Sequence, residues 1–359
     1  MTSVPGPESI DDLLARVHVV ALPMRVRFRG VTERELVLID GPAGWGEFGP
    51  FGEYHDPEAA HWLASAIEMA WQGPPPPVRS RVAVNATVPA VAAGEVGAIL
   101  DRFPGCSTVK VKVAEKGQQL VDDVARVAAV LQARPGARVR VDANGAWSVA
   151  EAAHAVRVLD QAVRAADVSR TGPVSLNGPG LEYVEQPCAT VDELVELRER
   201  LAADGVHVDV AADESIRRAE DPLRVVRAGG ADRAVVKVAP LGGPRRLLAV
   251  AAELGVPVTV SSALDSAVGV AAGVAAAAAL PGVGAGGGPG GDDEIPAAGM
   301  GTGVFFVEDV VDPGVFVLED GHLPVRQVAP DPARLENLRI GGERRDWWLD
   351  RIRRCHALL

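Results

Sequence analysis

The sequence predicts an α/β protein: a closed (β/α) barrel of parallel strands surrounded by helices, preceded by a smaller α+β domain. A short valine-rich strand pattern followed by a helix pattern occurs seven times in series. This alternation is typical of a parallel sheet covered by helices, and so many units favour a closed barrel over an open sheet. The length of 359 residues suits one large barrel or two domains. A doubly wound sheet is the alternative, but no G-x-G-x-x-G motif follows the first strand pattern.

The first 80 residues have a different pattern. We predict antiparallel strands over 18–28 and 33–51, joined by a turn, and a helix over 56–71. This order indicates a separate α+β capping domain, 1–80.

The barrel is predicted to occupy residues 81–304. Its strand patterns, each followed by a helix pattern, lie at 81–88, 108–114, 138–147, 181–187, 207–215, 233–240 and 257–264. The tail, 305–359, begins with a hairpin-like pattern and is expected to pack against the cap or the barrel. The Gly- and Pro-rich stretches 169–180 and 284–296 are expected to be surface loops.

Composition argues against nucleic-acid and membrane partners. The formal net charge of −12 disfavours a nucleic-acid groove, which needs clustered Lys and Arg. The most apolar stretch, 267–286, contains Pro281 and is rich in alanine, so we predict a buried helix and not a membrane span. The N-terminus is acidic where a secretory signal needs basic residues. We expect a soluble cytoplasmic protein, and the sequence does not indicate its oligomeric state.

The three cysteines, Cys106, Cys188 and Cys355, lie far apart and form no C-x-x-C motif. This spacing suggests neither a zinc site nor a disulfide framework. We predict three thiols that are buried or have no chemical role.

Polar side chains stand at the C-terminal ends of five consecutive strand patterns: Lys112, Asp142, Glu185, Asp213 and Lys237. In a barrel these ends meet at one mouth, where three carboxylates would repel one another unless a cation neutralised them. Hard oxygen ligands suit Mg²⁺, and lysines with lowered pKa values could act there as proton-transfer bases. Each residue alone could be a turn former, a helix cap or a solvated charge. The five together indicate a catalytic site.

Lys110 and Lys112 stand on the same face of one strand, because side chains alternate with a period of two. Each ammonium group disfavours the charging of the other. We predict that both lysines face the barrel interior, with Lys112 nearest the mouth and Lys110 one layer deeper.

Several segments resemble the successive barrel motifs of the enolase superfamily, in the branch whose base lies in a K-x-K motif. They are KVKV, VDANGAW, EYVEQP, AADES and VVKVAPLGG. The resemblance covers nearly the whole chain and implies a modified TIM barrel with an N-terminal α+β capping domain.

By this resemblance, Asp142, Glu185 and Asp213 would bind one Mg²⁺ ion, for which Mn²⁺ could substitute. Lys112 would remove the proton α to a substrate carboxylate, and Lys237 would stabilise the enolate from the opposite face. Further residues expected near the metal or the substrate are Lys110, Arg140, Asn144, Ser262 and Gly301. The stretch 45–54, rich in Gly and Phe, would form a lid from the cap.

The resemblance implies a dehydratase, a carbon–oxygen lyase of menaquinone biosynthesis. It would convert a small molecule, 2-succinyl-6-hydroxy-2,4-cyclohexadiene-1-carboxylate, into an aromatic product. An N-acylamino-acid racemase is the alternative within the superfamily, because two lysines on opposite substrate faces suit 1,1-proton transfer. A non-catalytic barrel used as a scaffold is a third possibility, disfavoured because all five polar strand ends are intact.

Overall fold

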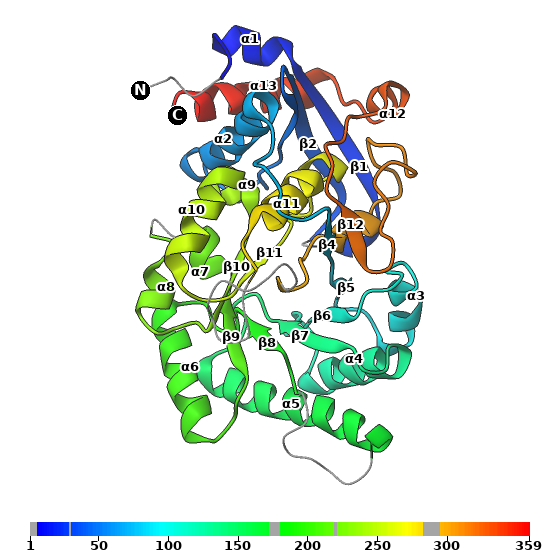
Figure 1. Ribbon diagram of the computed structural model, residues 1–359, viewed down its shortest axis with the longest axis vertical. Helices are drawn as coiled ribbons and strands as arrows, with labels where there is room; N and C mark the ends of the chain where they lie inside the picture. The colour runs from blue at the N-terminus through cyan, green and yellow to red at the C-terminus, as the bar shows by residue number, and fades with distance from the viewer. Residues whose placement is uncertain (1–5, 29, 172–179, 219–220, 283–294) are drawn as a thin grey trace.

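The computed structural model describes residues 6–28, 30–171, 180–218, 221–282 and 295–359. A cap containing a three-stranded sheet lies at one end of the molecule, and a barrel surrounded by helices forms the rest (Figure 1). The first helix, α1 (Ile10–Ala15), and the last, α13 (Gly342–His356), both lie at the cap end. Most of the two predicted loops, at 172–179 and 284–294, lies outside the described residues, and helix α5 extends to Thr171.

The cap sheet is antiparallel, with order β1 (Val17–Phe28), β2 (Val31–Gly41), β3 (Gly44–Phe48). Helix α2 (Asp56–Gln72) packs across it and contacts β3. The contact requires glycine at position 46, because a Cβ atom there would lie 2.0 Å from the Ala66 carbonyl oxygen. The predicted strand 18–28 and the helix are therefore present, whereas the predicted strand 33–51 is divided into β2 and β3, which pair with each other.

Seven parallel strands form the barrel sheet in sequence order. They are β5 (Ala86–Val88), β6 (Thr108–Lys112), β7 (Arg138–Asp142), β8 (Tyr183–Glu185), β9 (Asp209–Ala212), β10 (Arg233–Val236) and β11 (Val258–Val260). Ala298 and Gly299 join the two edges, since Ala298 pairs with Val84 and Gly299 pairs with Ser261. The barrel is thus closed, and its last position is filled by a short extended segment.

Side chains along β6 alternate between the barrel interior and the surrounding core, as predicted for Lys110 and Lys112. Lys110 pairs with Arg140 across β6 and β7, and Lys112 pairs with Asp142. These polar residues face the barrel interior, whereas the intervening valines, such as Val109 and Val111, are fully buried in the main hydrophobic core. The positions of the lysines within the barrel follow from this register.

Helices cover the outside of the barrel, and α4, α5 and α6 line its lower half in Figure 1. The helical segments of this region are η1 (Ala93–Glu95), α3 (Val96–Leu100), α4 (Leu120–Ala133), α5 (Val149–Thr171), α6 (Val191–Ala203), α7 (Glu214–Arg217), α8 (Arg224–Arg227), α9 (Val238–Leu241), α10 (Pro244–Leu254) and α11 (Ala267–Ala279). The alanine-rich α11 is almost wholly buried, as predicted. Among the described residues, no helix has the length and apolarity needed to cross a bilayer.

The tail contains η2 (Gly301–Phe305), β12 (His322–Pro324), α12 (Pro332–Asn337) and α13. The hairpin-like pattern at its start corresponds only to a tight antiparallel turn in which Glu319 pairs with His322, because β12 itself pairs with β4 (Arg81–Ala83). Strand β4 is also separate from the barrel sheet, so the predicted strand 81–88 is divided into two. Helix α13 contacts α2, and Trp348 packs edge-on against Phe48 of the cap sheet.

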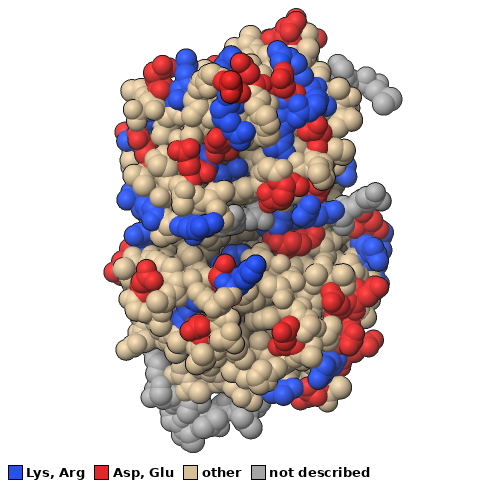
Figure 2. Space-filling view, turned by 180° about the vertical axis from the view of Figure 1, so that it is seen from behind, with Lys and Arg blue, Asp and Glu red and all other residues tan. Residues whose placement is uncertain are grey.

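Acidic and basic side chains are interspersed over the face drawn in Figure 2. Basic side chains gather in a band at mid-height of this face. Acidic side chains gather along the lower right edge of this view, and the whole chain carries a formal charge of −12.

The three thiols are buried, which confirms their predicted environment. Burial raises the pKa of Cys106 and Cys355 to about 11 and that of Cys188 to about 12. An exposed thiol has a pKa of about 8.5, so at pH 8 these cysteines should react with iodoacetamide more than about a hundredfold slower in the native protein. Mass spectrometry of labelled native and urea-unfolded protein measures the difference. Equal labelling in both states would contradict it.

Candidate active site

A small cavity of about 40 Å³ lies at the C-terminal ends of the barrel strands. Six of the residues predicted to form the site line it: Lys110, Lys112, Asp142, Asn144, Asp213 and Lys237. Ser262, which was predicted to contact the substrate, lines the same cavity and shares a 2.6 Å hydrogen bond with Thr302. Lysines from β6 and from the end of β10 therefore face one space, with carboxylates between them.

Lys110 and Lys112 both bind carboxylates of neighbouring strands. The Lys112 Nζ atom lies 2.6 Å from Asp142 Oδ2 and 2.7 Å from Asn144 Oδ1. The Lys110 Nζ atom donates to both Glu185 oxygens, at 2.8 and 3.0 Å, and lies 3.1 Å from Asp142 Oδ2. Asp142 thus lies between two ammonium groups, one at the mouth and one a layer deeper.

Asp213 is also bound on both of its oxygens. Lys237 donates to Oδ2, and Arg217 Nε donates to Oδ1 at 3.0 Å. Arg217 also donates to Glu214 Oε1 at 2.5 Å, and Asn144 Nδ2 donates to the same oxygen at 3.2 Å. Glu214, which was not predicted, thereby joins the group of acids.

The pKa values follow from burial and from these ion pairs. Burial by itself would raise the pKa of Asp142, but the Lys112 and Lys110 ammonium groups hold it well below its usual range. Burial and the nearby Asp142 charge raise the pKa of Glu185 to about 7. Burial lowers the pKa of Lys237, and Asp213 only partly offsets this effect. Lys110 keeps a pKa well above its usual value, because Glu185 and Asp142 outweigh its burial.

The donor set fits a divalent cation that prefers oxygen ligands. Asp142, Glu185, Asp213 and Glu214 all lie in this region, and the buried Oε2 atom of Glu214 has no hydrogen-bond partner. Within the described ranges, however, no three acidic, His or Cys side chains are already arranged around one point. The lysines take up the carboxylate oxygens instead, so metal binding would require their ammonium groups to move aside.

Two predicted support residues lie elsewhere. Arg140 is fully buried beneath the cavity, where it donates to Glu182 at 2.8 and 3.1 Å, to Asn85 and to the Ala297 carbonyl. Gly301 lines the larger cavity described below, and a Cβ atom there would lie 2.7 Å from the Phe103 ring. Buried guanidinium groups require partners, and Arg140 finds them among barrel residues in this structure.

The predicted lid, 45–54, is divided between two environments. Its first part, Trp45–Phe48, belongs to strand β3 of the cap sheet. The remainder is fixed by Arg351 of α13, which donates to the carbonyl oxygens of Pro50, Phe51 and Tyr54 at 2.6 to 3.2 Å. Tyr54 then reaches the barrel and accepts a hydrogen bond from Arg217.

Sequence analysis missed several residues of the site. Phe28 of the cap lines the cavity, and the Lys112 ammonium lies 5.7 Å from the centre of its ring. Gln186, next to Glu185, accepts hydrogen bonds from the backbone amides of Asp213 and Ser215 at 3.0 and 3.1 Å. It has a φ of 38°, a left-handed conformation that is uncommon for a residue other than glycine. Gln186 could have been found from the motif EQP, because a buried amide side chain beside an acid at the end of a strand needs hydrogen-bond partners.

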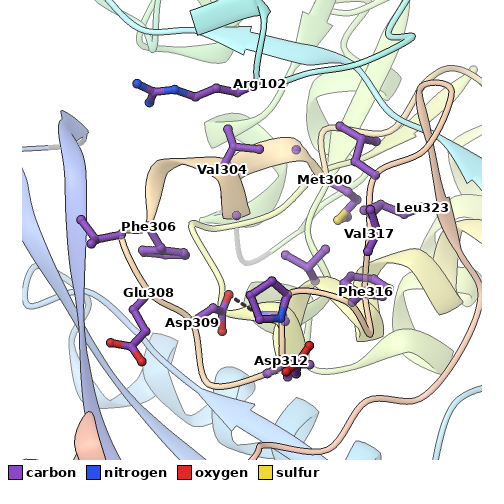
Figure 3. Close-up of a pocket in the computed structure, with 18 of the residues that line it drawn as sticks. Arg102, Met300, Val304, Phe306, Glu308, Asp309, Asp312, Phe316, Val317 and Leu323 are labelled. Atoms are coloured by element: carbon purple, nitrogen blue, oxygen red, sulfur yellow. Dashed lines mark hydrogen bonds between the residues drawn. The ribbon is translucent and has the colours of Figure 1, made fainter. Parts of the chain in front are cut away.

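A second cavity, of about 590 Å³, is lined by residues of η2 and of the tail that follows it (Figure 3). Apolar side chains including Phe306, Phe316 and Leu323 surround it, and Arg102 lies at the opposite side from Asp309 and Asp312. The Asp309 carboxylate accepts backbone hydrogen bonds from Ala267 and Val310. The smaller cavity is the candidate site despite its size, because the lysines and carboxylates converge there.

The cap and the barrel each match a known protein family. Residues 19–70 match the family described as Enolase N-terminal domain-like, and residues 98–330 match the family described as Enolase C-terminal domain-like. The chain belongs to the enolase superfamily. The fold expected from its barrel motifs is thereby confirmed.

Relatives and solved structures of this superfamily agree with the assignment. The chain is 56% identical to o-succinylbenzoate synthase of Mycobacterium marinum, over 99% of this chain and 98% of that protein. It is also 56% identical to o-succinylbenzoate synthase of Mycolicibacterium smegmatis, over 99% of each chain. The crystal structure of muconate lactonizing enzyme from Pseudomonas fluorescens, complexed with muconolactone, has a TM-score of 0.68 at 23% identity. It covers 90% of this chain and 98% of its own, and supports the fold alone.

Removal of the Lys110 ammonium should destabilise the metal-free protein. Lys110→Met leaves the buried Glu185, whose pKa is about 7, without the ammonium that contacts both of its oxygens. At pH 8 or above, where this carboxylate is charged in the unaltered protein, the loss of its partner lowers the free energy of unfolding by about 3 kcal/mol. Urea unfolding in the presence of a chelator measures this loss. Lys116→Met, at an exposed position, is the matched control. The interpretation fails if both variants have the same stability.

Proposed function

We propose that this chain is a Mg²⁺-dependent dehydratase that converts 2-succinyl-6-hydroxy-2,4-cyclohexadiene-1-carboxylate into o-succinylbenzoate in cytoplasmic menaquinone biosynthesis. The observation that carries the proposal is the pair of lysines, Lys112 and Lys237, that face one cavity with carboxylates between them. The 56% identity to o-succinylbenzoate synthases over nearly the whole chain supports the choice of substrate. All five polar residues at the strand ends are present, which argues against a non-catalytic scaffold.

In the proposed reaction, Lys112 accepts the proton from the carbon α to the substrate carboxylate. The electron pair of the broken C–H bond forms the new ring double bond, and the C–O bond breaks. The hydroxide leaves as water with a proton that Lys112 can return, so atoms and charge balance. Lys237 stands across the cavity, where its ammonium group stabilises the negative charge on the substrate.

Asp142, Glu185 and Asp213 are the proposed ligands of Mg²⁺. When bound, the ion supplies positive charge beside the substrate carboxylate. Four acids of this region face four cations, and the pairs are Lys112 and Lys110 with Asp142, Lys110 with Glu185, Lys237 and Arg217 with Asp213, and Arg217 with Glu214. These formal charges cancel when all three lysines are protonated. With Lys112 neutral, as its role as a base requires, bound Mg²⁺ would leave the site with a charge of +1, which favours binding of an anionic substrate.

Activity should depend on a divalent cation. Treatment with a chelator, followed by its removal, should abolish turnover, and Mg²⁺ should restore it, with Mn²⁺ as a substitute. Glu185→Gln should weaken Mg²⁺ binding by at least about tenfold, because an amide oxygen carries no negative charge. Calorimetric Mg²⁺ titration and circular dichroism separate loss of binding from loss of folding. Full activity in metal-free protein would refute the metal requirement.

The two lysines also permit racemase chemistry, so substrate preference must be measured. We expect kcat/KM for the cyclohexadiene substrate to exceed that for any N-succinylamino acid by more than about tenfold, because specificity is the ratio of these constants. Lys112→Ala should abolish both turnover and exchange of the α-proton with D₂O. A preference of tenfold or more for N-succinylamino acids would overturn the dehydratase assignment while leaving the fold and the metal site intact.

A further inference from the structure

We propose that Arg217 is a positioning residue for the metal site and that Tyr54 of the cap holds it in place. This inference rests on the proposed function, because it concerns binding of Mg²⁺ by Asp213. It adds two residues, one in the barrel and one in the cap, that do not touch the substrate cavity.

Arg217 is placed to orient two acids at once. It stands four residues after Asp213, one helical turn along the short helix α7, and is 7% exposed. Its Nε atom binds Asp213 Oδ1 at 3.0 Å, and its Nη2 atom binds Glu214 Oε1. The planar guanidinium group binds both carboxylates through nitrogen atoms in a rigid fork, whereas the ammonium group of a lysine is a single rotatable point of contact.

The arrangement leaves the other oxygen of Asp213 available for exchange. Lys237 donates to Oδ2, whereas Arg217 donates to Oδ1. A cation that displaces Lys237 from Oδ2 would therefore meet a carboxylate already oriented from its other side. Gln186 reinforces this orientation, because its side-chain oxygen accepts from the Asp213 amide at 3.0 Å.

Tyr54 links Arg217 to the cap. Its hydroxyl accepts from Arg217 Nη1, and its ring lies 5.5 Å from that of Trp62 in helix α2. Its carbonyl oxygen accepts from Arg351 of α13 at 2.6 Å. Tyr54 is 3% exposed, so the chain of contacts from cap to metal site is buried throughout.

The test must preserve charge. Removing a positive charge beside the acids would by itself strengthen Mg²⁺ binding. This gain would mask the weaker binding expected from the loss of orientation. Arg217→Lys retains the charge but not the fork geometry, and Tyr54→Phe removes only the hydroxyl. Arg227→Lys is the matched control, because Arg227 forms an exposed ion pair with Asp221, which is neither Tyr54 nor a proposed metal ligand.

Calorimetric titration of each purified protein with Mg²⁺ measures the dissociation constant without reference to turnover. Arg217→Lys should weaken binding by about 10- to 100-fold, the usual effect of losing a residue that orients a metal ligand. Tyr54→Phe should weaken it in the same direction by a smaller factor. The double variant should bind no more weakly than Arg217→Lys, because Tyr54 acts through Arg217. The Mg²⁺ concentration for half-maximal activity should rise by the same factor, and excess Mg²⁺ should restore most of kcat.

The results separate this inference from the proposed function. If the unaltered protein binds no Mg²⁺, the proposed metal-dependent function fails. If it binds Mg²⁺ and Tyr54→Phe binds with the same constant, the inference is overturned, even if Arg217→Lys does not fold. An equal loss in Arg227→Lys would also overturn it, because the effect would then come from a general response to replacing an arginine.

Discussion

The structure depends on the mutual neutralisation of acids and bases buried at the mouth of the barrel. Asp142, Glu185 and Asp213 are at most 1% exposed, and each binds at least one lysine or arginine. An isolated charge in such a place would be strongly disfavoured, and paired charges remain only where the geometry is good. Parallel strands in register supply that geometry, since Lys112, Asp142 and Glu185 are successive partners across β6, β7 and β8.

Much of this arrangement could be predicted from the sequence because it is periodic. Side chains alternate along each strand, and the C-terminal ends of parallel strands meet at one edge. These two rules were enough to bring Lys110, Lys112, Asp142, Asp213 and Lys237 into one cavity. The cap sheet and the buried α11 followed from local patterns in the same way.

The remaining features depend on contacts that leave no local pattern. Tyr54 and Arg217 are separated by 163 residues, and neither belongs to a repeated motif. The hairpin-like pattern in the tail yields only the tight turn at Glu319 and His322, because β12 pairs with β4, more than 200 residues earlier in the chain. For Arg140, the alternation of side chains predicts that it faces the barrel interior. It does not predict the partners Glu182 and Asn85, which hold the guanidinium group below the cavity.

The way the barrel closes also determines where it can change shape. Between β11 and the start of the barrel, the ring is joined by single bridges at Ala298 and Gly299, whereas neighbouring strands elsewhere share two to five paired residues. Thr302, three residues further on, shares its hydroxyl hydrogen bond with Ser262 at the cavity wall. An insertion or a substitution at this seam would therefore alter the cavity wall at Ser262, while the register of Lys112, Asp142 and Glu185 on β6, β7 and β8 would stay unchanged.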